Sequence, residues 1–380
     1  MEESSLDILF YELIRVAIDA QGCLSRLPEV GEWGKLYKKA KKQSLVGVCF
    51  AALQKLGADM DDGFDRIGMN EMLYLKWMGM AAKIQQKNEI VNRQCRALQK
   101  RLSADGLRSV ILKGQGVGQL YGSLMGLRQS GDIDVWVSGS RDETMAYVQK
   151  VSPTNEVTRL HTQLKVFEET EVEIHFMPTY MRCPWLNASL QKWFKKYEDF
   201  DSFRIKDGIR VPSLEFNVVF LLLHIFRHLL GEGIGLRQVM DYYFVLQEYE
   251  GMGGGCDKAE TMKLLEHLRL HRFASGLMWV LAIVFDGQSQ VKGNRLEVKE
   301  WMICEPDEKL GRLILREIEL SGNFGLHDER SKEGESALKR FYRTNATNLR
   351  FMRYFPEEVL CTPFYRAWHK CWQLRHGYRG

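Results

Sequence analysis

Apolar residues recur at steps of three and four through most of the N-terminal quarter of the chain, which is the spacing of one face of an α-helix. The pattern is clearest at Leu6, Leu9 and Leu13. Further helices are predicted at residues 33–42, 46–56 and 70–102, with a break near Ser44 and a stop signal at Asp105-Gly106. Residues 1–105 are therefore predicted to form an N-terminal helical domain.

From residue 106 the pattern changes to short β-branched runs. Strands are predicted at residues 108–112 (RSVIL) and 131–137 (GDIDVWV), with a short helix at 115–121 between them and another helix at 142–150. Three further strand-like runs, at residues 156–160, 163–167 and 171–176, indicate a β-meander with a hairpin turn at Glu168-Glu169-Thr170. This order predicts a small core of helices and a mixed sheet over residues 106–212.

Helical patterning returns after Pro212. Helices are predicted at residues 214–230 and 235–248, then as far as about residue 285, and finally at 364–374, with a flexible break at the glycine-rich run 251–255. Residues 213–380 are therefore predicted to form a C-terminal helical domain. The fold class that follows is α+β, a small mixed-sheet core flanked by N- and C-terminal helical domains.

Composition restricts the compartment and the class of protein. With 45% hydrophobic and 27% charged residues the 380-residue chain can bury a core, and a net charge of +4 neither requires nor excludes a nucleic-acid partner. The most apolar run, residues 218–230, is too short and too polar to span a bilayer. The eight cysteines are dispersed, which disfavours structural zinc and a disulfide framework. The N-terminus has no signal-peptide order, so a cytoplasmic location is expected.

Two carboxylates on the strand at 131–137 are the most informative pair. Residues two apart on a strand project to the same face, so Asp132 and Asp134 point one way while Ile133, Val135 and Val137 face the core. Adjacent acids repel one another, and their burial is costly unless a cation lies between them. Mg²⁺ prefers such hard oxygen ligands together with substrate phosphates.

A third acid would complete a site for two metal ions. Glu173 lies on the predicted strand 171–176, on the same face as His175 and opposite Ile174. In such a site two ions stabilise the attacking and the leaving oxygens of an in-line displacement. Solvent-facing strand acids would give the same pattern, and a lone DxD is a loose motif. The combination of turn, helix, DxD strand and later acid is what favours a functional site.

Residues around the first turn are candidate phosphate contacts. Lys113-Gly114 lies between a strand and a helix, where backbone N–H groups can cradle phosphate, although a simple tight turn explains the glycines equally well. Arg128 either reaches a phosphate or pairs with a surface acid. With Ser130 and Gly131, these residues make up the predicted nucleotide-binding set.

These residues resemble a known family. The chain carries, in order, Leu112-Lys113-Gly114, Leu120-Tyr121, Arg128 and Gly131-Asp132-Ile133-Asp134. This series is similar to the signature of the uncharacterised bacterial nucleotidyltransferases, which belong to the DNA polymerase β-like superfamily. The similarity extends to Glu173-Ile174-His175, and to His224 followed by Leu236-Arg237 and Asp241.

The resemblance implies a polymerase β-like core in which Asp132, Asp134 and Glu173 are catalytic and bind two Mg²⁺ ions, with an NTP, expected to be ATP, as substrate. Two departures stand out. The wider superfamily carries Gly-Ser where this chain has Lys113-Gly114, which puts the details of phosphate binding in doubt. The third acid is Glu where Asp is common, which makes the role of Glu173 less secure.

Other polar residues admit two interpretations each. His175, His224, Arg237 and Asp241 are possible substrate contacts. His224 and His228 are equally compatible with half-buried structural histidines, and Arg237 with Asp241 has the spacing of an intrahelical ion pair. His161, Gln163 and Lys165 share a strand face near the site, either as substrate contacts or as solvated residues.

The C-terminal segment interleaves basic and aromatic residues, from Lys339 to Arg375. This pattern suits RNA binding, but packing of an amphipathic helix is the favoured interpretation.

Three functions fit the sequence. The first is nucleotidyl transfer from an NTP to an unidentified hydroxyl or phosphate on a small molecule, a protein or an RNA. The second is a sugar-nucleotide glycosyltransferase, which also holds a metal diphosphate with DxD; the segment before Asp132 is too short for its usual nucleotide-binding half-fold. The third is a non-catalytic nucleotide-binding or scaffold protein.

Overall fold

The computed structural model describes residues 4–19, 22–57, 66–251, 258–287, 291–292, 295–296, 298–325 and 337–379. Among these residues, no helix combines the length and the apolarity needed to cross a membrane. The predicted break at 251–255 falls outside the described residues, apart from Gly251 at the end of a helix.

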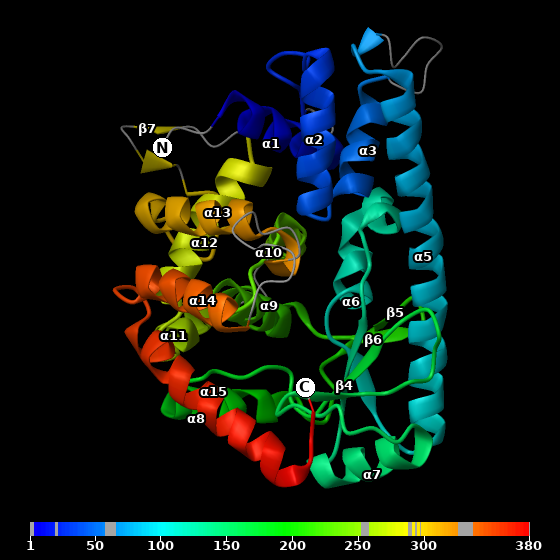
Figure 1. Ribbon diagram of the computed structural model, residues 1–380, viewed down its shortest axis with the longest axis vertical. Helices are drawn as coiled ribbons and strands as arrows, with labels where there is room; N and C mark the ends of the chain where they lie inside the picture. Colours follow the sequence, from blue (N-terminus) through cyan, green and yellow to red (C-terminus); the bar gives the residue numbers. More distant parts are fainter. Residues whose placement is uncertain are drawn as a thin grey trace.

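The N-terminal part is helical, as the periodicity predicts. It contains α1 (Ser5–Ile18), α2 (Val30–Lys42), α3 (Val46–Lys55) and the long α5 (Glu71–Ala104), which runs along one side of the molecule (Figure 1). Polar caps set the starts of two of these helices: Ser4 accepts a hydrogen bond from the Asp7 amide, and Asn70 accepts one from the Leu73 amide.

A four-stranded mixed sheet forms the centre of the α/β part, in the order β1-β2-β4-β3. Its strands are β1 (Ser109–Ile111), β2 (Ile133–Val137), β3 (His161–Gln163) and β4 (Val172–His175). β2 pairs with β1 antiparallel and with β4 parallel, and β3 pairs with β4 antiparallel. Between β1 and β2 lie the short α6 (Gln115–Gly118) and the 3₁₀ segment η1 (Gln119–Leu127); α7 (Arg141–Val151) follows β2.

The two faces of β2 have different partners. Ile133, Val135 and Val137 pack in a buried cluster with the α5 side chains Val91, Cys95, Leu98 and Leu102. On the opposite face, the ring of Trp136 stacks on Phe216 of α9 (Leu214–Leu229). The predicted alternation is therefore confirmed, and the even-numbered face that carries Asp134 is directed toward the C-terminal helices.

One predicted strand is wrong. Residues 156–160 make only isolated bridges, from Glu156 to Arg379 and from Val157 to Thr162. The Val157 amide bonds the Arg379 carbonyl, and the Thr158 amide bonds the His161 carbonyl in a tight turn. The backbone groups that a strand would place in a ladder are therefore taken by the C-terminus and by this turn. The next strand is also earlier than predicted, at 161–163 instead of 163–167.

Several elements were not predicted, among them helix α8 (Pro184–Phe194), the hairpin of β5 (Arg204–Lys206) and β6 (Ile209–Val211), and helix α13 (Glu308–Ser321). The 3₁₀ turns η2 (Lys195–Tyr197) and η3 (Asn323–Gly325) complete the connections around them.

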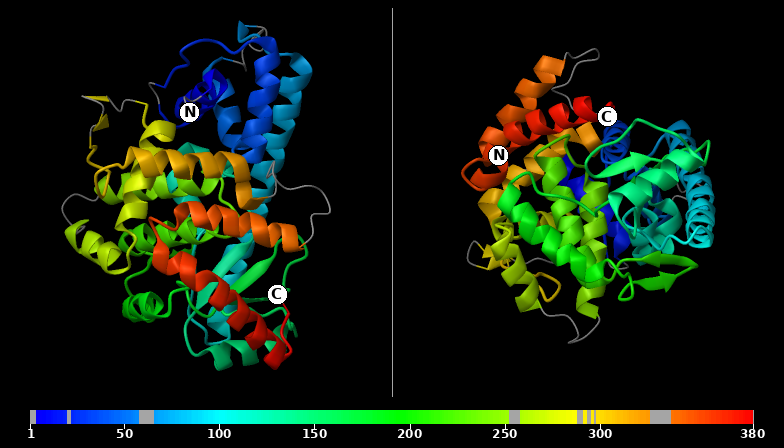
Figure 2. Two further views of the ribbon diagram at one scale, coloured as in Figure 1. Left: turned by 60° about the vertical axis from the view of Figure 1, so that its left-hand side comes forward. Right: turned by 90° about the horizontal axis from the view of Figure 1, so that it is seen from below.

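The remaining C-terminal elements are α10 (Leu236–Gly251), α11 (Lys258–His267), α12 (His271–Phe285), the short β7 (Val291–Lys292) and β8 (Arg295–Leu296), α14 (Ala337–Phe351) and α15 (Pro356–His376). α14 and α15 lie on the side of the molecule away from α5 (Figure 2).

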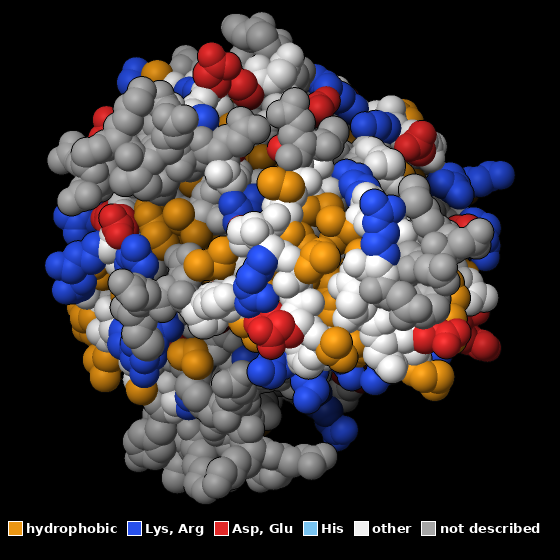
Figure 3. All heavy atoms as spheres, turned by 90° about the horizontal axis from the view of Figure 1, so that it is seen from above, with side chains coloured by type: hydrophobic (Ala, Val, Ile, Leu, Met, Phe, Trp, Pro, Cys, Tyr) orange, Lys and Arg blue, Asp and Glu red, His pale blue; other side chains and the backbone are white. Residues whose placement is uncertain are grey.

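One continuous apolar core joins the helices at the two ends of the chain. It includes Leu13 of α1, Trp33 of α2, Phe220 of α9 and Val280 of α12. The division at residues 105 and 212 stays a prediction. On the face formed by the N-terminal helices, Lys and Arg side chains are scattered among apolar and acidic ones (Figure 3).

Candidate active site

The three predicted acids converge at one end of the two central strands. Asp132 directly precedes β2, and the parallel register places Asp134 of β2 opposite Glu173 of β4. Carboxylate oxygens of Asp132, Asp134 and Glu173 all lie within 4.8 Å of one another. Parallel pairing of β2 with β4 is what brings together acids that are far apart in the chain.

The electrostatics of the three acids differ. The negative charge of Asp134, with burial second, raises the pKa of Asp132 above its usual value. Burial also acts against ionisation of Asp134, but the nearby Lys113 and His175 hold its pKa below the usual value. Glu173 behaves in the same way, because contacts with His161 and His175 outweigh burial and lower its pKa. A cation is therefore still favoured next to Asp132.

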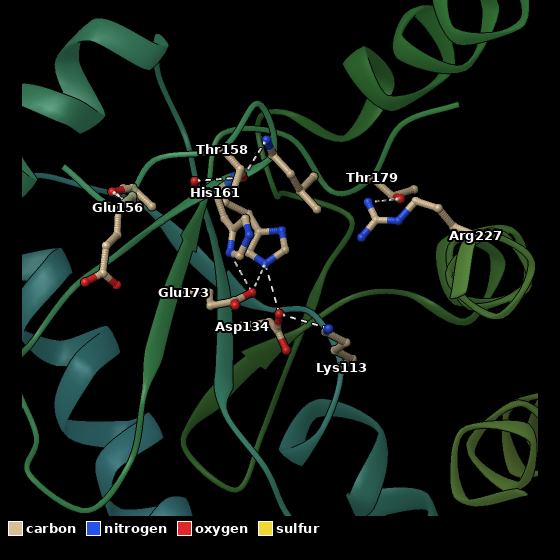
Figure 4. A network of polar contacts seen from close by, with 11 residues as sticks. Lys113, Asp134, Glu156, Thr158, His161, Glu173, Thr179 and Arg227 are labelled. Carbon is tan, nitrogen blue, oxygen red and sulfur yellow. Dashed lines mark hydrogen bonds and ion pairs between the residues drawn. The ribbon is translucent and has the colours of Figure 1, made fainter. Parts of the chain in front are cut away.

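Basic side chains surround Asp134 and Glu173, as Figure 4 shows. Lys113 Nζ lies 3.0 Å from Asp134 Oδ1, and His175 Nε2 lies 2.9 Å from the same oxygen. His161 Nδ1 lies 2.7 Å from Glu173 Oε2. Burial lowers the pKa of Lys113, but the carboxylates of Asp134 and Asp132 outweigh this and raise it, so its amine is a cation at neutral pH.

The turn that presents Lys113 depends on glycine. Gly114 has φ 58°, a conformation that other L-residues adopt at a cost. A Cβ atom at Gly116 would lie 2.6 Å from the Ile111 carbonyl oxygen, so α6 approaches β1 closely only because this residue has no side chain. These two glycines therefore set the position of Lys113 beside the acids.

Arg128 lies at the site but is held by a carboxylate. Its Nε and Nη2 donate hydrogen bonds of 2.7 and 2.6 Å to the two oxygens of Asp241, and the Tyr121 hydroxyl donates one of 2.7 Å to Asp241 Oδ1. The predicted alternative of a surface acid is wrong, because both side chains of this ion pair are about 95% buried. Arg128 Nη1 has no hydrogen-bond partner among the described residues.

Arg237 and the helical histidines also reach the site. Arg237 Nη1 donates a 2.6 Å hydrogen bond to the Gln129 carbonyl, while Asp241 is engaged by Arg128. His224 is buried, and its pKa is well below the usual value because of burial and then the charge of Lys113. His228 contacts the His224 ring and lies 3.4 Å from Glu232.

A pocket at this end of the sheet collects most of the predicted residues. Its lining comprises Lys113, Gly114, Arg128, Gly131, Asp132, Asp134, Leu221, His224, Ile225, Arg237, Gln238, Asp241 and Phe324. Glu173 and His175 are not in this lining, and they adjoin it through Asp134. Ser130 is buried beside it, and its hydroxyl has no partner among the described residues.

Sequence reasoning did not single out several of these residues. Leu221, Ile225 and Gln238 come from the interior faces of α9 and α10, and Phe324 comes from η3. Local pattern carries no signal for them, because it does not show which helix face covers the site. The sequence came closer to predicting the contact of His161 with Glu173. Alternation along the strand had already placed His161 on the face near the site.

The C-terminal aromatic residues largely pack. The guanidinium of Arg141 lies 4.1 Å from the ring centre of Phe176 and 4.8 Å from that of Trp372, and Tyr365 stacks on Tyr180. Phe364 and Trp368 remain exposed. The side chains of residues 339–342 lie outside the described part of the chain, and RNA binding by this segment stays a prediction.

The chain matches one family model, described as uncharacterised nucleotidyltransferase, over residues 29–286. This range takes in α2, the whole sheet, the pocket residues of α9 and α10, and α12. No curated protein and no solved structure matches the chain.

Proposed function

The chain belongs to the uncharacterised nucleotidyltransferase family, and we propose that it transfers a nucleoside monophosphate from ATP to a hydroxyl or phosphate acceptor in a Mg²⁺-dependent reaction. The observation that carries this proposal is the convergence of three carboxylates at the edge of a pocket walled by cationic side chains. Membership of this family makes the protein a transferase and speaks against the glycosyltransferase and scaffold alternatives.

The residues present fit a divalent ion. Asp132, Asp134 and Glu173 are hard oxygen donors within reach of one another, and the raised pKa of Asp132 reflects negative charge that the neighbouring amine and imidazole leave uncompensated. Two Mg²⁺ ions held there would neutralise phosphate charge and align the reacting oxygens.

The chain's own cations account for binding of the triphosphate. Lys113 contacts Asp134 from the wall of the pocket, and Arg128 and Arg237 line the same space from η1 and α10. Among the residues that the structure describes, Arg128 Nη1 is a buried donor without an acceptor, which is costly unless a ligand accepts its hydrogen bond. Ser130, whose buried hydroxyl also lacks a partner within the described part of the chain, and Gly131 next to Asp132 are the further proposed contacts.

The shape of the site also supports positioning of the donor. α9 covers the acidic face of the sheet with Leu221, His224 and Ile225, so one wall of the pocket is mostly apolar and excludes water. His224 contributes no positive charge there at neutral pH, because burial keeps its pKa low. The positive charge of the pocket is therefore concentrated in Lys113, Arg128 and Arg237.

A label-transfer assay tests the proposal. The protein is incubated with Mg²⁺, each of the four α-³²P-labelled NTPs and cell extract separated into RNA, protein and small-molecule fractions. We expect label from ATP in one fraction. Asp132→Asn and Asp134→Asn should each lower transfer at least about 100-fold, as for other groups that stabilise transition-state charge. Asp142→Asn, at an exposed position of α7, is the matched control and should retain transfer.

Binding measurements complete the test. Titration calorimetry of the protein with ATP and Mg²⁺ should show binding that weakens in the Asp132→Asn, Asp134→Asn double variant. Undiminished Mg²⁺-dependent ATP binding in a double variant with wild-type circular dichroism would refute the proposal, as would label transfer that this variant retains.

A further inference from the structure

Two histidines and Glu173 form a second group of ligand atoms beside the three acids. His161 of β3 and His175 of β4 are directly paired across the antiparallel ladder, and Glu173 lies two residues before His175 on the same face. One ligand atom from each of the three lies within 4.8 Å of the others. The two imidazole rings are 5.3 Å apart and both reach the Glu173 carboxylate (Figure 4).

This group differs chemically from the carboxylate set. Its donors are two imidazole nitrogens and one carboxylate oxygen, and the two groups have only Glu173 in common. Imidazole nitrogen suits zinc and neighbouring transition metals, whereas carboxylate oxygen suits Mg²⁺. Two histidines with one glutamate are also a ligand set that holds zinc with an open fourth position.

The distances already approach those of a coordination sphere. Three ligand atoms about 2.1 Å from one metal ion in tetrahedral or octahedral geometry are about 3.0–3.4 Å from one another. His161 Nδ1 lies 2.7 Å from Glu173 Oε2, and His175 Nε2 lies 3.5 Å from the same oxygen. Side-chain adjustments of a few tenths of an ångström therefore suffice around Glu173, and the backbone pairing of β3 with β4 already fixes the ligand order.

Burial favours a defined site. His175 is almost fully buried, and the side chains of His161 and Glu173 are each 22% exposed, so the ligand atoms are mostly shielded from solvent but not closed off from it. Because the ligands lie on two paired strands, their side chains have less rotational freedom to lose when an ion binds than exposed side chains would have. The arrangement is thus preformed on rigid elements.

We propose that His161, Glu173 and His175 bind one transition-metal ion of the zinc class, at a site next to the Mg²⁺ carboxylates. The site rests on the proposed function only in sharing Glu173 with it. Occupancy redirects His175 Nε2 away from Asp134 and leaves Lys113 as the neighbouring cation of that carboxylate. An ion at the nitrogen-containing site therefore changes how many cationic side chains contact Asp134 of the carboxylate site.

Cobalt titration of the full-length protein tests the proposal, with Co²⁺ as a spectroscopic substitute for Zn²⁺. The metal-free protein is titrated in the absence of nucleotide, and d–d absorption reports the bound ion; thiolate charge-transfer bands reveal any binding to cysteine. We expect one Co²⁺ per chain without thiolate bands, displaced by Zn²⁺ but not by millimolar Mg²⁺.

Variants identify the ligands. His161→Gln removes a partly exposed ligand and should weaken Co²⁺ binding by more than the roughly 100-fold that loss of an outer contact can cost. His175→Gln should do the same, and its circular dichroism is compared with that of the wild type because the residue is buried. His267→Gln, at an exposed histidine of α11, is the matched control and should bind Co²⁺ like the wild type.

The outcomes separate this proposal from the previous one. Asp132→Asn should abolish nucleotidyl transfer and leave Co²⁺ binding in place, which would support the nitrogen-containing site. Loss of Co²⁺ binding in Asp132→Asn would place the ion at the carboxylates and overturn the inference. Absence of stoichiometric binding, or binding that His161→Gln retains, would also overturn it and would leave His175 as a hydrogen-bonded bridge between Asp134 and Glu173.

Discussion

Asp241 of α10 accepts hydrogen bonds from Arg128, 113 residues earlier, and from Tyr121, 120 residues earlier. These contacts join the C-terminal helices to the segment that leads into β2. Both charged side chains are about 95% buried, so water does not compensate either charge when the other is removed. Loss of one partner from such a buried pair costs about 3–5 kcal/mol. We therefore expect Asp241→Asn to lower the free energy of unfolding by about 3–5 kcal/mol.

Two comparisons separate the charge from the shape of this contact. Tyr121→Phe removes one hydrogen bond to a charged acceptor and should cost about 1.5–3 kcal/mol, less than Asp241→Asn. The double variant Arg128→Met, Asp241→Leu removes both charges and keeps apolar volume, so it should be more stable than either single variant.

Urea unfolding followed by tryptophan fluorescence, with the same probe for every variant, measures these differences. A cost below about 1 kcal/mol for Asp241→Asn would show that water or another group compensates Arg128. A double variant that is less stable than both single variants would show that packing around the pair, and not its charge, dominates. Either result would refute the reasoning.

Three further predictions concern other parts of the molecule. Burial and Lys113 hold the pKa of His224 well below its usual value, so the unfolded chain takes up a proton near pH 6.5 that the folded chain does not. Stability should therefore fall as the pH drops from 6.5 to 5.5, and His224→Gln should remove about 1 kcal/mol of that fall in urea unfolding. Gly47→Ala should cost about 1–3 kcal/mol, because a Cβ atom there would lie 2.2 Å from the Leu127 carbonyl oxygen; thermal unfolding measures this. Arg141→Lys should cost about 1–2 kcal/mol in the same assay, because the planar guanidinium lies over the rings of both Phe176 and Trp372.

Each of these predictions has an outcome that would contradict it. An unchanged slope of stability against pH in His224→Gln would contradict the first prediction. A Cβ atom at Gly79 of α5 would meet no atom of the described residues within 4 Å, so Gly79→Ala should stabilise by about 0.5–1 kcal/mol. A similar loss in both glycine variants would exclude the steric explanation. For Arg141, full stability in the lysine variant would show that charge alone is sufficient.

Much of the candidate site follows from short-range pattern. Alternation along β2 places Asp134 on one face and Ile133 and Val135 on the other, and the structure confirms this with α5 against the apolar face. The same alternation places Glu173 and His175 together on β4. Such predictions succeed because a strand fixes side-chain direction through its own backbone geometry.

Partners across the fold were predicted less well. Arg237 and Asp241 have the spacing of an intrahelical pair, yet Asp241 is taken by Arg128, and Arg237 donates to the Gln129 carbonyl. A buried bidentate pair of Arg128 with Asp241 is more stable than an ion pair between two neighbours on one helix, so Asp241 pairs with Arg128. The predicted strand at residues 156–160 was wrong for a related reason, because Arg379 near the C-terminus takes part in its backbone hydrogen bonding.

The sequence by itself determined the helical N- and C-terminal parts, the small α/β centre, the faces of β2 and β4 and the residue types of the acidic site, because these depend on periodicity within single elements. Only the tertiary structure decided that β4 lies parallel to β2 with Glu173 opposite Asp134, that His161 and His175 meet at Glu173, and that α9 and α10 close the pocket. These features depend on which apolar faces bury against one another, and that choice is made by packing over the whole chain.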